Sequence, residues 1–308
     1  MNQRLVKVIK NPYKVFNWLA AHHLLNWMDD KTYLKLVYRG HFGKKLNLDN
    51  PITFNEKLQW LKLYNRKPEY TIMVDKVKAK EYVANIIGEE HIIPTLGVWD
   101  DPDDIDFDKL PDQFVLKCNH NSGIGLCICK DKSKLDIEKV KEGLRKGLKE
   151  DFYQMGREWP YKNVPRKILA EKYMVDSEYD KKAIEKKECV LTDYKFFCFG
   201  GEPFMMYVSQ DHAEHATTDF FDMDYNLLPI RMRDPNSENP PACPKEFEEM
   251  KQYARMLSKN IPHLRVDFYV INHHVYFGEL TFYHNAGFSL VKPHEWNVKL
   301  GNLIKLKS

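Results

Sequence analysis

Two carboxylates near the C-terminus have the residue types and spacing of a divalent-metal site. Side chains alternate along a strand, so Asp267 shares a face with Arg265 in "RVDFYV". In "VYFGELTF", Glu279 shares a face with Thr281 in the same way. If residues 272–274 form a three-residue loop, Asp267 lies directly opposite Glu279. Facing carboxylates repel each other and favour a cation such as Mg²⁺ between them. The alternative is a register shifted by one residue, which puts one carboxylate in solvent.

A loop rich in glycine and small polar residues is a candidate for binding phosphate groups. The stretch "FVLKCNHNSGIGLCICK", residues 114–130, places two short apolar runs around it, which is typical of a β-hairpin. Lys117 stands at the entrance of the loop, which contains Asn119, Asn121, Ser122, Gly123 and Gly125. Bare main-chain amides with one ammonium group suit a polyphosphate. The alternative is a hairpin whose glycines serve only the turn. Neither the G-x-x-x-x-G-K-[ST] loop nor the complete dinucleotide fingerprint is present.

Hydrophobic periodicity predicts the elements that must position these side chains. Thr53 and Glu56 have capping-box spacing, so we expect a helix to begin at Phe54. A second helix is expected to have Asp75 as its cap and to end at Gly88. Further helices are predicted over 137–149 and 246–257. Strands are predicted over 114–116, 126–129, 168–175, 193–199, 204–210, 264–270 and 275–282, with a strand pair within 220–230. The fold class is therefore α+β with mostly antiparallel sheets.

The composition is that of an ordinary globular protein. The 308 residues are 43% apolar and 30% charged, and no apolar run approaches the roughly 18 residues of a membrane span. An apolar signal core followed by a small-residue cleavage site is absent, so we expect a cytoplasmic chain. The six cysteines lack C-x-x-C spacing and fall mostly within predicted strands. Buried free thiols are therefore expected, rather than disulfides or a zinc site.

Positive charge is concentrated in residues 1–50. They contain nine Lys and Arg against three Asp, although the whole chain carries only +3. Apolar residues are interleaved with these charges, namely Val6, Ile9, Phe16, Trp18, Leu19, Leu24 and Trp27. Such a segment suits peripheral contact with the inner face of an anionic membrane or with an acidic polymer. The alternative is a docked helix with a solvated basic face. The small overall charge argues against a nucleic-acid partner.

Taken in order, these motifs resemble the ATP-grasp superfamily, and within it the TupA-like group associated with teichuronopeptide and other surface-polysaccharide synthesis. Four features carry the resemblance: Asp75-Lys76 before "IIPTLGVW", Lys117 before the glycine-rich loop, Glu171 in "ILAEKYM", and Asp267 with Glu279-Leu280-Thr281. They are similar to the D-K helix, the flap, the acidic hinge strand and the metal-binding D and E-x-N of the superfamily. The stretches "ITFNEKLQWLKLY" and "DYKFFCFGGEP" resemble the TupA-like group specifically.

The resemblance implies an ATP-grasp fold, in which two α/β subdomains with mostly antiparallel sheets clasp a nucleotide. We expect a helical N-terminal segment over 1–70, a first ATP-grasp part with the flap over 71–175, and a second part with the metal-binding hairpin over 176–308. The implied ATP-binding residues are Lys76, Lys117, Ser122, Gly123, Gly125, Glu171 and Lys195. Asp267 and Glu279 are expected to hold one or two Mg²⁺ ions.

The chain departs from the family pattern at the third metal ligand. Thr281 replaces the usual asparagine, and Asn285 is a nearby substitute. Other interpretations of the single residues remain open. Lys76 could be a solvated lysine, Glu171 the exposed position of a half-buried strand, and Arg265 an ion-pair partner of Glu279.

The implied activity is ATP-dependent ligation of a carboxylate to an amine through an acyl phosphate, with Arg265 and Lys195 as catalytic residues. For surface polysaccharides the carboxylate would be a uronic acid, free or in a polymer, and the amine an amino acid. The main rival is a glycosyltransferase, because Asp222-Met223-Asp224 resembles a D-x-D motif. A non-catalytic nucleotide- or glycan-binding protein is a third possibility. Zinc hydrolysis is poorly supported, because His212-Ala213-Glu214-His215 lacks H-E-x-x-H spacing.

Overall fold

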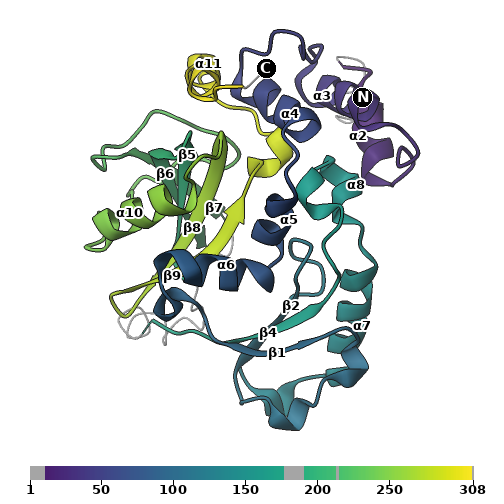
Figure 1. Ribbon diagram of the computed structural model, residues 1–308, viewed down its shortest axis with the longest axis vertical. Coiled ribbons are helices and arrows are strands. Elements are labelled where there is room, and N and C mark those ends of the chain that lie inside the picture. Colours follow the sequence, from purple (N-terminus) through teal and green to yellow (C-terminus); the bar gives the residue numbers. More distant parts are fainter. Residues whose placement is uncertain (1–10, 177–190, 213–214, 307–308) are drawn as a thin grey trace.

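The protein folds into two antiparallel sheets with a helical segment at one end (Figure 1). The computed structural model describes residues 11–176, 191–212 and 215–306. The first sheet, sheet A, has the order β1-β4-β2-β3 and consists of β1 (Thr95–Trp99), β2 (Phe114–Cys118), β3 (Cys127–Cys129) and β4 (Ile168–Lys172). The second, sheet B, has the order β7-β6-β5-β8-β9 and consists of β5 (Asp193–Phe199), β6 (Glu202–His212), β7 (His215–Asp222), β8 (His263–Ile271) and β9 (His274–Thr281). The predicted α+β class is confirmed.

Each sheet is covered by a helix that the sequence predicts. Helix α10 (Phe247–Leu257) packs on β5, β6 and β8, and its predicted face of Phe247, Met250, Ala254 and Leu257 is buried. Helix α7 (Ile137–Lys149) has the predicted bounds and packs on β2, with Asp136 capping its first turn. Apolar residues spaced three or four apart explain both contacts, because that spacing puts them on one side of a helix.

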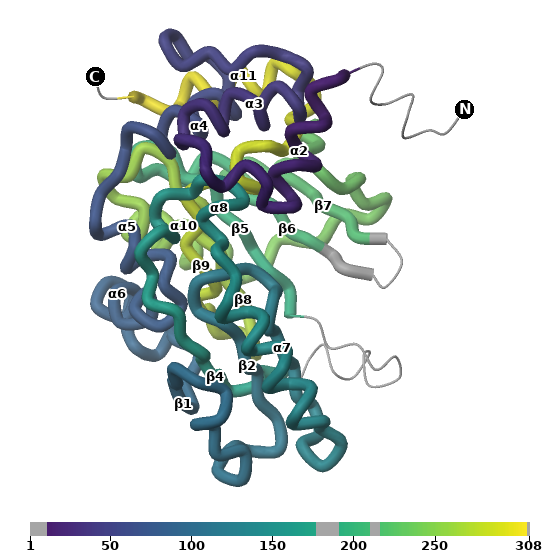
Figure 2. The backbone as a smooth tube through the Cα atoms, turned by 90° about the vertical axis from the view of Figure 1, so that its right-hand side faces the viewer, coloured from purple at the N-terminus to yellow at the C-terminus, as the bar shows by residue number. Residues whose placement is uncertain are grey.

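The remaining helices are α2 (Lys14–Ala21), α3 (Asp30–Phe42), α4 (Phe54–Tyr64), α5 (Pro68–Val74), α6 (Lys78–Ile87), the short α8 (Phe152–Gly156) and α11 (His294–Leu303). Of these, α2, α3 and α4 belong to the N-terminal segment, and α5 and α6 contribute to one wall of the site. In α4 both bonds of the capping box from Thr53 and Glu56 are present, as predicted. In the side view, α2, α3, α4 and α11 lie at one end of the molecule and sheet A at the other (Figure 2). The division at residues 70 and 175 stays a prediction.

Three sequence-based expectations about element bounds are wrong. Helix α6 begins at Lys78 without a side-chain cap, and Asp75 instead accepts the main-chain N–H of Val77 in the turn before it. Strand β4 ends at Lys172, not at residue 175. The strand pair expected within 220–230 is shorter than predicted: the end of β7 pairs with residues 226–228 across a turn, through one antiparallel bridge between Phe221 and Leu227. At Asp75 and Asp222, local hydrogen bonds from the side chain to the main chain compete with the regular pattern.

The described cysteines are free thiols, as expected. Cys118, Cys129 and Cys198 are buried, Cys127 is half-buried and Cys243 is exposed. Cys189 lies outside the described residues. In the described part of the chain, no helix has both the length and the apolar character needed to span a membrane. At the N-terminal end, α2 and α3 enclose a small core of their own, while Trp18 and Trp27 remain exposed.

Candidate active site

The hairpin of β8 and β9 places the two predicted carboxylates opposite each other. The turn has two residues, Asn272 and His273, both left-handed with φ of 51° and 60°, so the expected three-residue loop is wrong. A two-residue turn alone would put Gly278 opposite Asp267. An irregularity between Asp267 and Phe268 shifts the pairing by one residue and brings Glu279 opposite Asp267. The opposed pair therefore depends on a bulge that compensates for the shorter turn.

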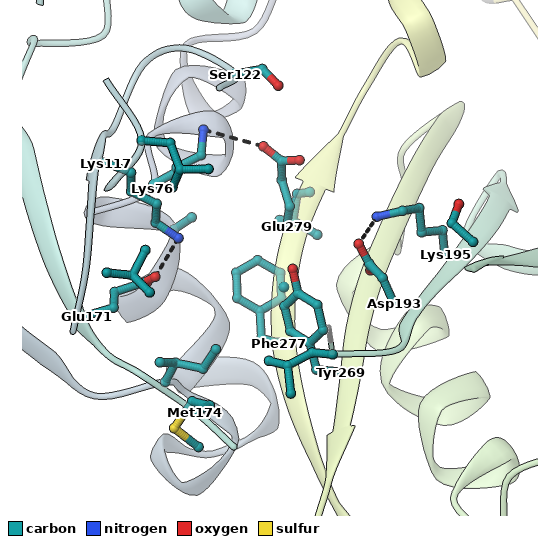
Figure 3. Close-up of a pocket in the computed structure, with 18 of the residues that line it drawn as sticks. Lys76, Lys117, Ser122, Glu171, Met174, Asp193, Lys195, Tyr269, Phe277 and Glu279 are labelled. Carbon is teal, nitrogen blue, oxygen red and sulfur yellow. Dashed lines mark hydrogen bonds and ion pairs between the residues drawn. The ribbon is translucent and has the colours of Figure 1, made fainter. Parts of the chain in front are cut away.

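A cavity of about 890 Å³ lies between the two sheets. Sheet A contributes Val115, Lys117 and Glu171 to its wall, and sheet B contributes Lys195, Tyr207 and Glu279. Lys76 comes from the turn before α6, and Lys80 from the first turn of that helix. In the close-up, Lys76 and Lys117 approach from one side, with Lys195 and Asp193 on the other side of Glu279 (Figure 3). The fold thus brings together side chains that are up to two hundred residues apart in sequence.

Glu171 ties together two lysines on the sheet A side of the cavity. Its carboxylate lies 2.5 Å from Nζ of Lys117 and 2.7 Å from Nζ of Lys80. Burial raises the pKa of Glu171, but Lys117 and Lys80 outweigh burial and hold it below its usual value. Burial lowers the pKa of Lys80, against the attraction of Glu171. The cluster carries a net positive charge, which suits an anionic ligand.

The glycine-rich loop is anchored at its base by the asparagines. Asn119 donates to Oδ1 of Asp75 at 2.8 Å, and Asn121 donates to the carbonyl of Gly147 at 3.0 Å. Nζ of Lys76 donates to the carbonyl of Asn121 at 2.6 Å, so this lysine is not simply solvated. Ser122, next in the chain, lines the cavity.

The two flap glycines adopt left-handed angles that a glycine takes at little cost. Gly123 has φ of 88° and Gly125 has φ of 80°. A Cβ atom on Gly125 would lie 3.1 Å from Sγ of Cys118, whereas Gly123 faces open space. The base of the loop is therefore packed, and its tip is not.

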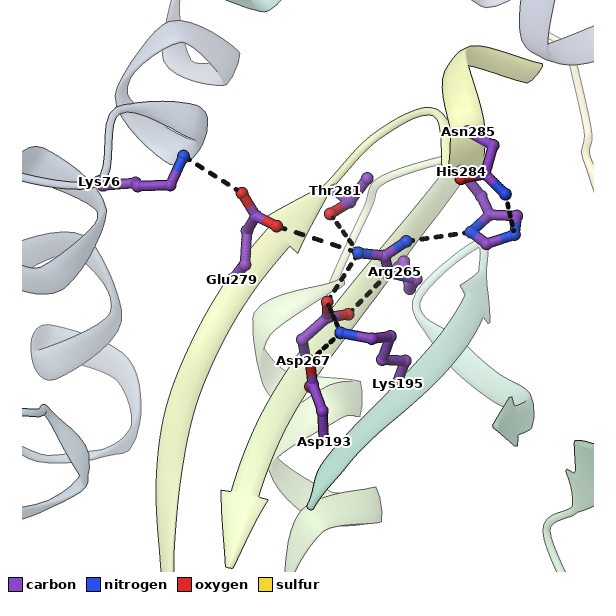
Figure 4. Close-up of polar contacts among 9 residues, drawn as sticks. All are labelled: Lys76, Asp193, Lys195, Arg265, Asp267, Glu279, Thr281, His284 and Asn285. Atoms are coloured by element: carbon purple, nitrogen blue, oxygen red, sulfur yellow. Dashed lines mark hydrogen bonds and ion pairs between the residues drawn. The ribbon is translucent and has the colours of Figure 1, made fainter. Parts of the chain in front are cut away.

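On the sheet B side, Asp267 is bound by two cations (Figure 4). Arg265 donates from Nε to Oδ1 and from Nη2 to Oδ2, both at 2.7 Å, and Lys195 donates to Oδ2 at 3.0 Å. Lys195 also bonds Asp193. Burial raises the pKa of Asp267, but Arg265 and Lys195 outweigh burial and lower it. Burial raises the pKa of Asp193 to about 6, against the attraction of Lys195.

The other predicted metal ligands, Glu279, Thr281 and Asn285, differ in how available their oxygen atoms are to a metal ion. Glu279 is 34% exposed, and its nearest cations are Lys76 at 3.5 Å and Arg265 at 3.9 Å. Thr281 accepts a hydrogen bond from Nη2 of Arg265 at 3.0 Å. Asn285 is exposed, lines the cavity and has φ of 47°. Among the described residues, no three His, Cys, Asp or Glu side chains are grouped as a metal site.

Sequence reasoning missed three residues of the site. Lys80 lies one helical turn after Lys76, and the lysine-rich helix conceals which of its lysines face the cavity. Asp193 shares a strand face with Lys195, so period-two alternation could have found it. His284, which accepts from Nη1 of Arg265 at 3.0 Å, has no local signal.

The aspartates of the D-x-D sequence do not line the cavity. Oδ1 of Asp222 accepts the main-chain N–H groups of Asp224 and Asn226 at 2.9 Å and 2.8 Å. Its other oxygen accepts from the side chain of Asn226 at 3.1 Å. Asp222 therefore caps a turn, which explains the motif without a sugar nucleotide. The sequence His212-Ala213-Glu214-His215 lies partly outside the described residues.

Two sheets that clasp a lysine-lined cavity, with a glycine-rich hairpin at its edge, define the ATP-grasp class of ATP-dependent ligases. The model of the TupA-like ATPgrasp family matches residues 56–305, and the chain belongs to this family. The match includes the flap hairpin, both sheets and α4. A search of curated proteins finds no match.

Solved structures of ligases are similar to this chain at low sequence identity. The D-alanine–D-alanine ligase of Helicobacter pylori is 12% identical, with a TM-score of 0.45, over 82% of this chain and 69% of its own. The D-alanine–D-alanine ligase of Bacillus anthracis is 20% identical, with a TM-score of 0.44, over 76% and 66%. The N5-carboxyaminoimidazole synthase of Aspergillus clavatus is 9% identical, with a TM-score of 0.39, over 71% and 46%.

Proposed function

We propose that this protein uses ATP to join a carboxylate to an amine, and that the carboxylate belongs to a surface polysaccharide or its precursor. The observation that carries the proposal is one cavity that is lined by lysines from both sheets and by Glu279. Spread positive charge beside one available carboxylate suits a triphosphate with its metal ion. Family membership supports the nucleotide as ATP.

The nucleotide is proposed to lie across the cavity, with its base in the apolar part. Val115, Met174 and Phe277 line that part. The phosphate chain would extend toward Lys76 and Lys117 beneath the flap of Ser122, Gly123 and Gly125. Glu171, which holds Lys117, would position this lysine and face the nucleotide near the hinge between the sheets.

The residues fit a magnesium ion held mainly by Glu279. Its oxygens form only long ion pairs, with Lys76 at 3.5 Å and Arg265 at 3.9 Å, so they can bind a metal together with phosphate oxygens. Asp267 fits the role of a second ligand less well, because Arg265 and Lys195 already bind its oxygens. When bound, the ion would neutralise the charge that develops on the phosphates.

The proposed reaction has two displacements. An oxygen of the substrate carboxylate attacks the γ-phosphorus, the bond to the β-phosphate oxygen breaks, and ADP leaves. The amine then attacks the carbonyl carbon of the acyl phosphate, phosphate leaves with the electron pair of its C–O bond, and the nitrogen loses a proton. Lys195 would approach the transferred phosphoryl group, and Arg265 would stabilise the charge on the reacting oxygens. The flap would exclude water that hydrolyses the acyl phosphate.

The proposed co-substrates are a uronic acid and an amino acid, at or near the inner face of a membrane in the cytoplasm. The association of the family with surface polysaccharides supports this choice. The exposed Trp18 and Trp27 and the basic N-terminal segment support peripheral membrane contact.

The test is release of ADP and phosphate from Mg-ATP in the presence of uronic acids and a pool of amino acids. We expect release that requires both co-substrates and is lost in Lys117→Ala. The matched control is Asp222→Ala, at the capped turn outside the cavity, which should retain activity. Loss of activity in Asp222→Ala with an active Lys117→Ala, or UDP release from a sugar nucleotide, would favour a glycosyltransferase instead. Nucleotide binding without turnover would indicate a binding protein.

A further inference from the structure

The polar face of α4 binds the chain segment that follows the metal-binding hairpin. Asn55, Gln59 and Lys62 lie on one side of the helix and are 1%, 0% and 0% exposed. Their side chains donate five hydrogen bonds of 2.7–3.1 Å to the carbonyls of Ala286, Gly287 and Ser289. We call these three side chains the α4 clamp. Buried donors of this kind need hydrogen-bond acceptors, and here the acceptors are the main-chain carbonyls of residues 286, 287 and 289.

The segment that the α4 clamp holds has an unusual backbone. Asn285, Ala286 and Gly287 are consecutive left-handed residues with φ of 47°, 51° and 67°. Left-handed geometry is unfavourable for alanine, so the segment needs outside contacts to keep this conformation. A Cβ atom on Gly287 would lie 2.4 Å from Nε2 of Gln59, which shows how closely the helix approaches. The α4 clamp therefore fixes the backbone next to Asn285, and with it the direction of the Asn285 side chain.

The hydrogen bonds of His284 decide how the Asn285 amide is oriented. Nδ1 of His284 lies 3.0 Å from Nη1 of Arg265, and a guanidinium can only donate, so Nδ1 accepts. The ring proton is then on Nε2, which must donate. Nε2 lies 3.1 Å from the amide atom of Asn285 that is assigned as Nδ2. This atom must be the oxygen, because two donors cannot bond each other.

The same assignment suits the second partner of the amide. The atom assigned as Nδ2 also lies 2.6 Å from Oγ of Ser289, whose hydroxyl can donate to an oxygen equally well. Exchanging the two amide atoms turns the NH₂ group of Asn285 away from His284 and Ser289. Asn285 is exposed and lines the cavity, so this group is free to donate to a ligand there.

We propose that Asn285 is a substrate-binding donor, held by the α4 clamp, that hydrogen-bonds an anionic oxygen of the carboxylate substrate or of the phosphoryl group transferred to it. The inference rests on the proposed function and replaces the expectation that Asn285 binds metal. Arg265 is buried behind His284, which lines the cavity, and adds positive charge near such an oxygen. Asn55, Gln59 and Lys62 are positioning residues that act through the left-handed segment.

The orientation of the amide is tested by ¹⁵N NMR of the histidine rings. We expect His284 to be the neutral tautomer with its proton on Nε2, and its signals are assigned by their loss in His284→Gln. A proton on Nδ1 would overturn the argument, because the Asn285 amide could then donate to the ring. This measurement needs no substrate and is independent of the proposed function.

The ligand is tested with sodium acetate and sodium phosphate as separate probes, added to the protein with Mg-ADP. The side-chain NH₂ signals of Asn285, assigned by their loss in Asn285→Asp, should shift with at least one probe. A shift with acetate indicates a carboxylate oxygen, and a shift with phosphate a phosphoryl oxygen. If neither probe shifts them, Asn285 is not the donor. Failure of the proposed function is seen separately, as absence of Mg-ADP binding in the same samples.

The variant Asn285→Asp separates a donor from a metal ligand. It should weaken binding of the effective probe by about tenfold or more, because a carboxylate repels an anion and cannot donate. Affinity for Mn²⁺ with ADP should stay within about twofold of the unmodified protein. Tighter Mn²⁺ binding in Asn285→Asp, or its loss in Asn285→Ala, would make Asn285 a metal ligand and overturn the proposal.

The positioning role is tested with Gln59→Met, which keeps the bulk of the side chain and removes its donors. We expect weaker binding of the effective probe with unchanged Mg-ADP affinity. Lys57→Met is the matched control, because Lys57 lies on the same helix but donates to Ile304 at the far end of the chain. If Gln59→Met does not fold, Asn55→Leu removes two other donors of the α4 clamp and should weaken binding of the probe in the same way. Unchanged probe binding in the folded variant would refute the role.

Discussion

Asp267 and Glu279 stand opposite each other on β8 and β9, yet their carboxylates have different partners. Asp267 is almost completely buried and holds Arg265 and Lys195. Glu279 is one-third exposed and forms only long ion pairs, with Lys76 at 3.5 Å and Arg265 at 3.9 Å. The two acids therefore serve different purposes. Asp267 fixes the cations of sheet B, and Glu279 is available to a ligand.

Glu279→Gln should remove the metal dependence of nucleotide binding. The amide keeps the shape of the side chain but lacks the charge that attracts Mg²⁺. We expect ADP to bind equally well with and without Mg²⁺, and turnover to fall by about 10²–10³-fold. Calorimetric titration with ADP, in the presence and in the absence of Mg²⁺, measures the change in nucleotide affinity. Glu202→Gln, at a surface ion pair with Arg255, is the control and should behave as the unmodified protein.

Glu171→Gln should destabilise the fold strongly, although the two side chains have nearly the same size and shape. The change leaves Lys80 and Lys117 without their buried carboxylate, and removing one partner of a buried ion pair costs about 3–5 kcal/mol. Added Mg-ADP should restore part of the loss, because phosphates would offer the lysines another anion. Urea unfolding with and without nucleotide checks both statements. Glu142→Gln breaks an exposed pair with Lys146 and should have no measurable effect.

Gly287→Ala and Gly200→Ala form a matched pair, because both positions are left-handed with φ of 67° and 62°. A Cβ atom at Gly200 meets no atom within 4 Å, whereas at Gly287 it would meet Gln59 at 2.4 Å. Gly200→Ala should cost about 1–2 kcal/mol for backbone geometry alone. Gly287→Ala should cost more, since the helix must also move. Equal free energies of unfolding would contradict the close contact between α4 and this segment.

Stability should depend on pH through Lys62. Burial lowers its pKa from 10.5 to about 7, so between these values the unfolded chain binds a proton that the folded chain does not. The free energy of unfolding should therefore rise as pH increases from 7 toward 10.5. Lys62→Met should flatten this rise, as measured by urea unfolding across that range. An unchanged slope in Lys62→Met would assign the pH dependence to other groups.

Glu158 should make the free energy of unfolding depend on pH below pH 7. Burial raises its pKa from 4.5 to about 7, so the folded chain keeps a proton that the unfolded chain releases. Its contribution to stability is then present below pH 4.5 and is lost as the pH rises to 7. Glu158→Gln should remove this fall. Because Lys62 lowers the pKa of Glu158 and Glu158 raises that of Lys62, each variant is measured on both sides of pH 7.

Periodicity and capping chemistry determined most of the elements from sequence alone. The bounds of α7, the start of α4 and the buried face of α10 all follow from residues within a few positions of one another. The order of motifs also indicated the family, which the match over residues 56–305 confirms. Such signals are local, so a single sequence contains them in full.

Only the tertiary structure decided the details of the site. The opposed pair of Asp267 and Glu279 needs both a two-residue turn and a bulge, and alternation cannot distinguish this combination from a longer loop. The contact of Lys80 with Glu171 joins a helix to a strand ninety-one residues later. The α4 clamp reaches a segment more than two hundred residues away. These contacts depend on how elements pack in space, and packing is a property of the whole chain that no local pattern encodes.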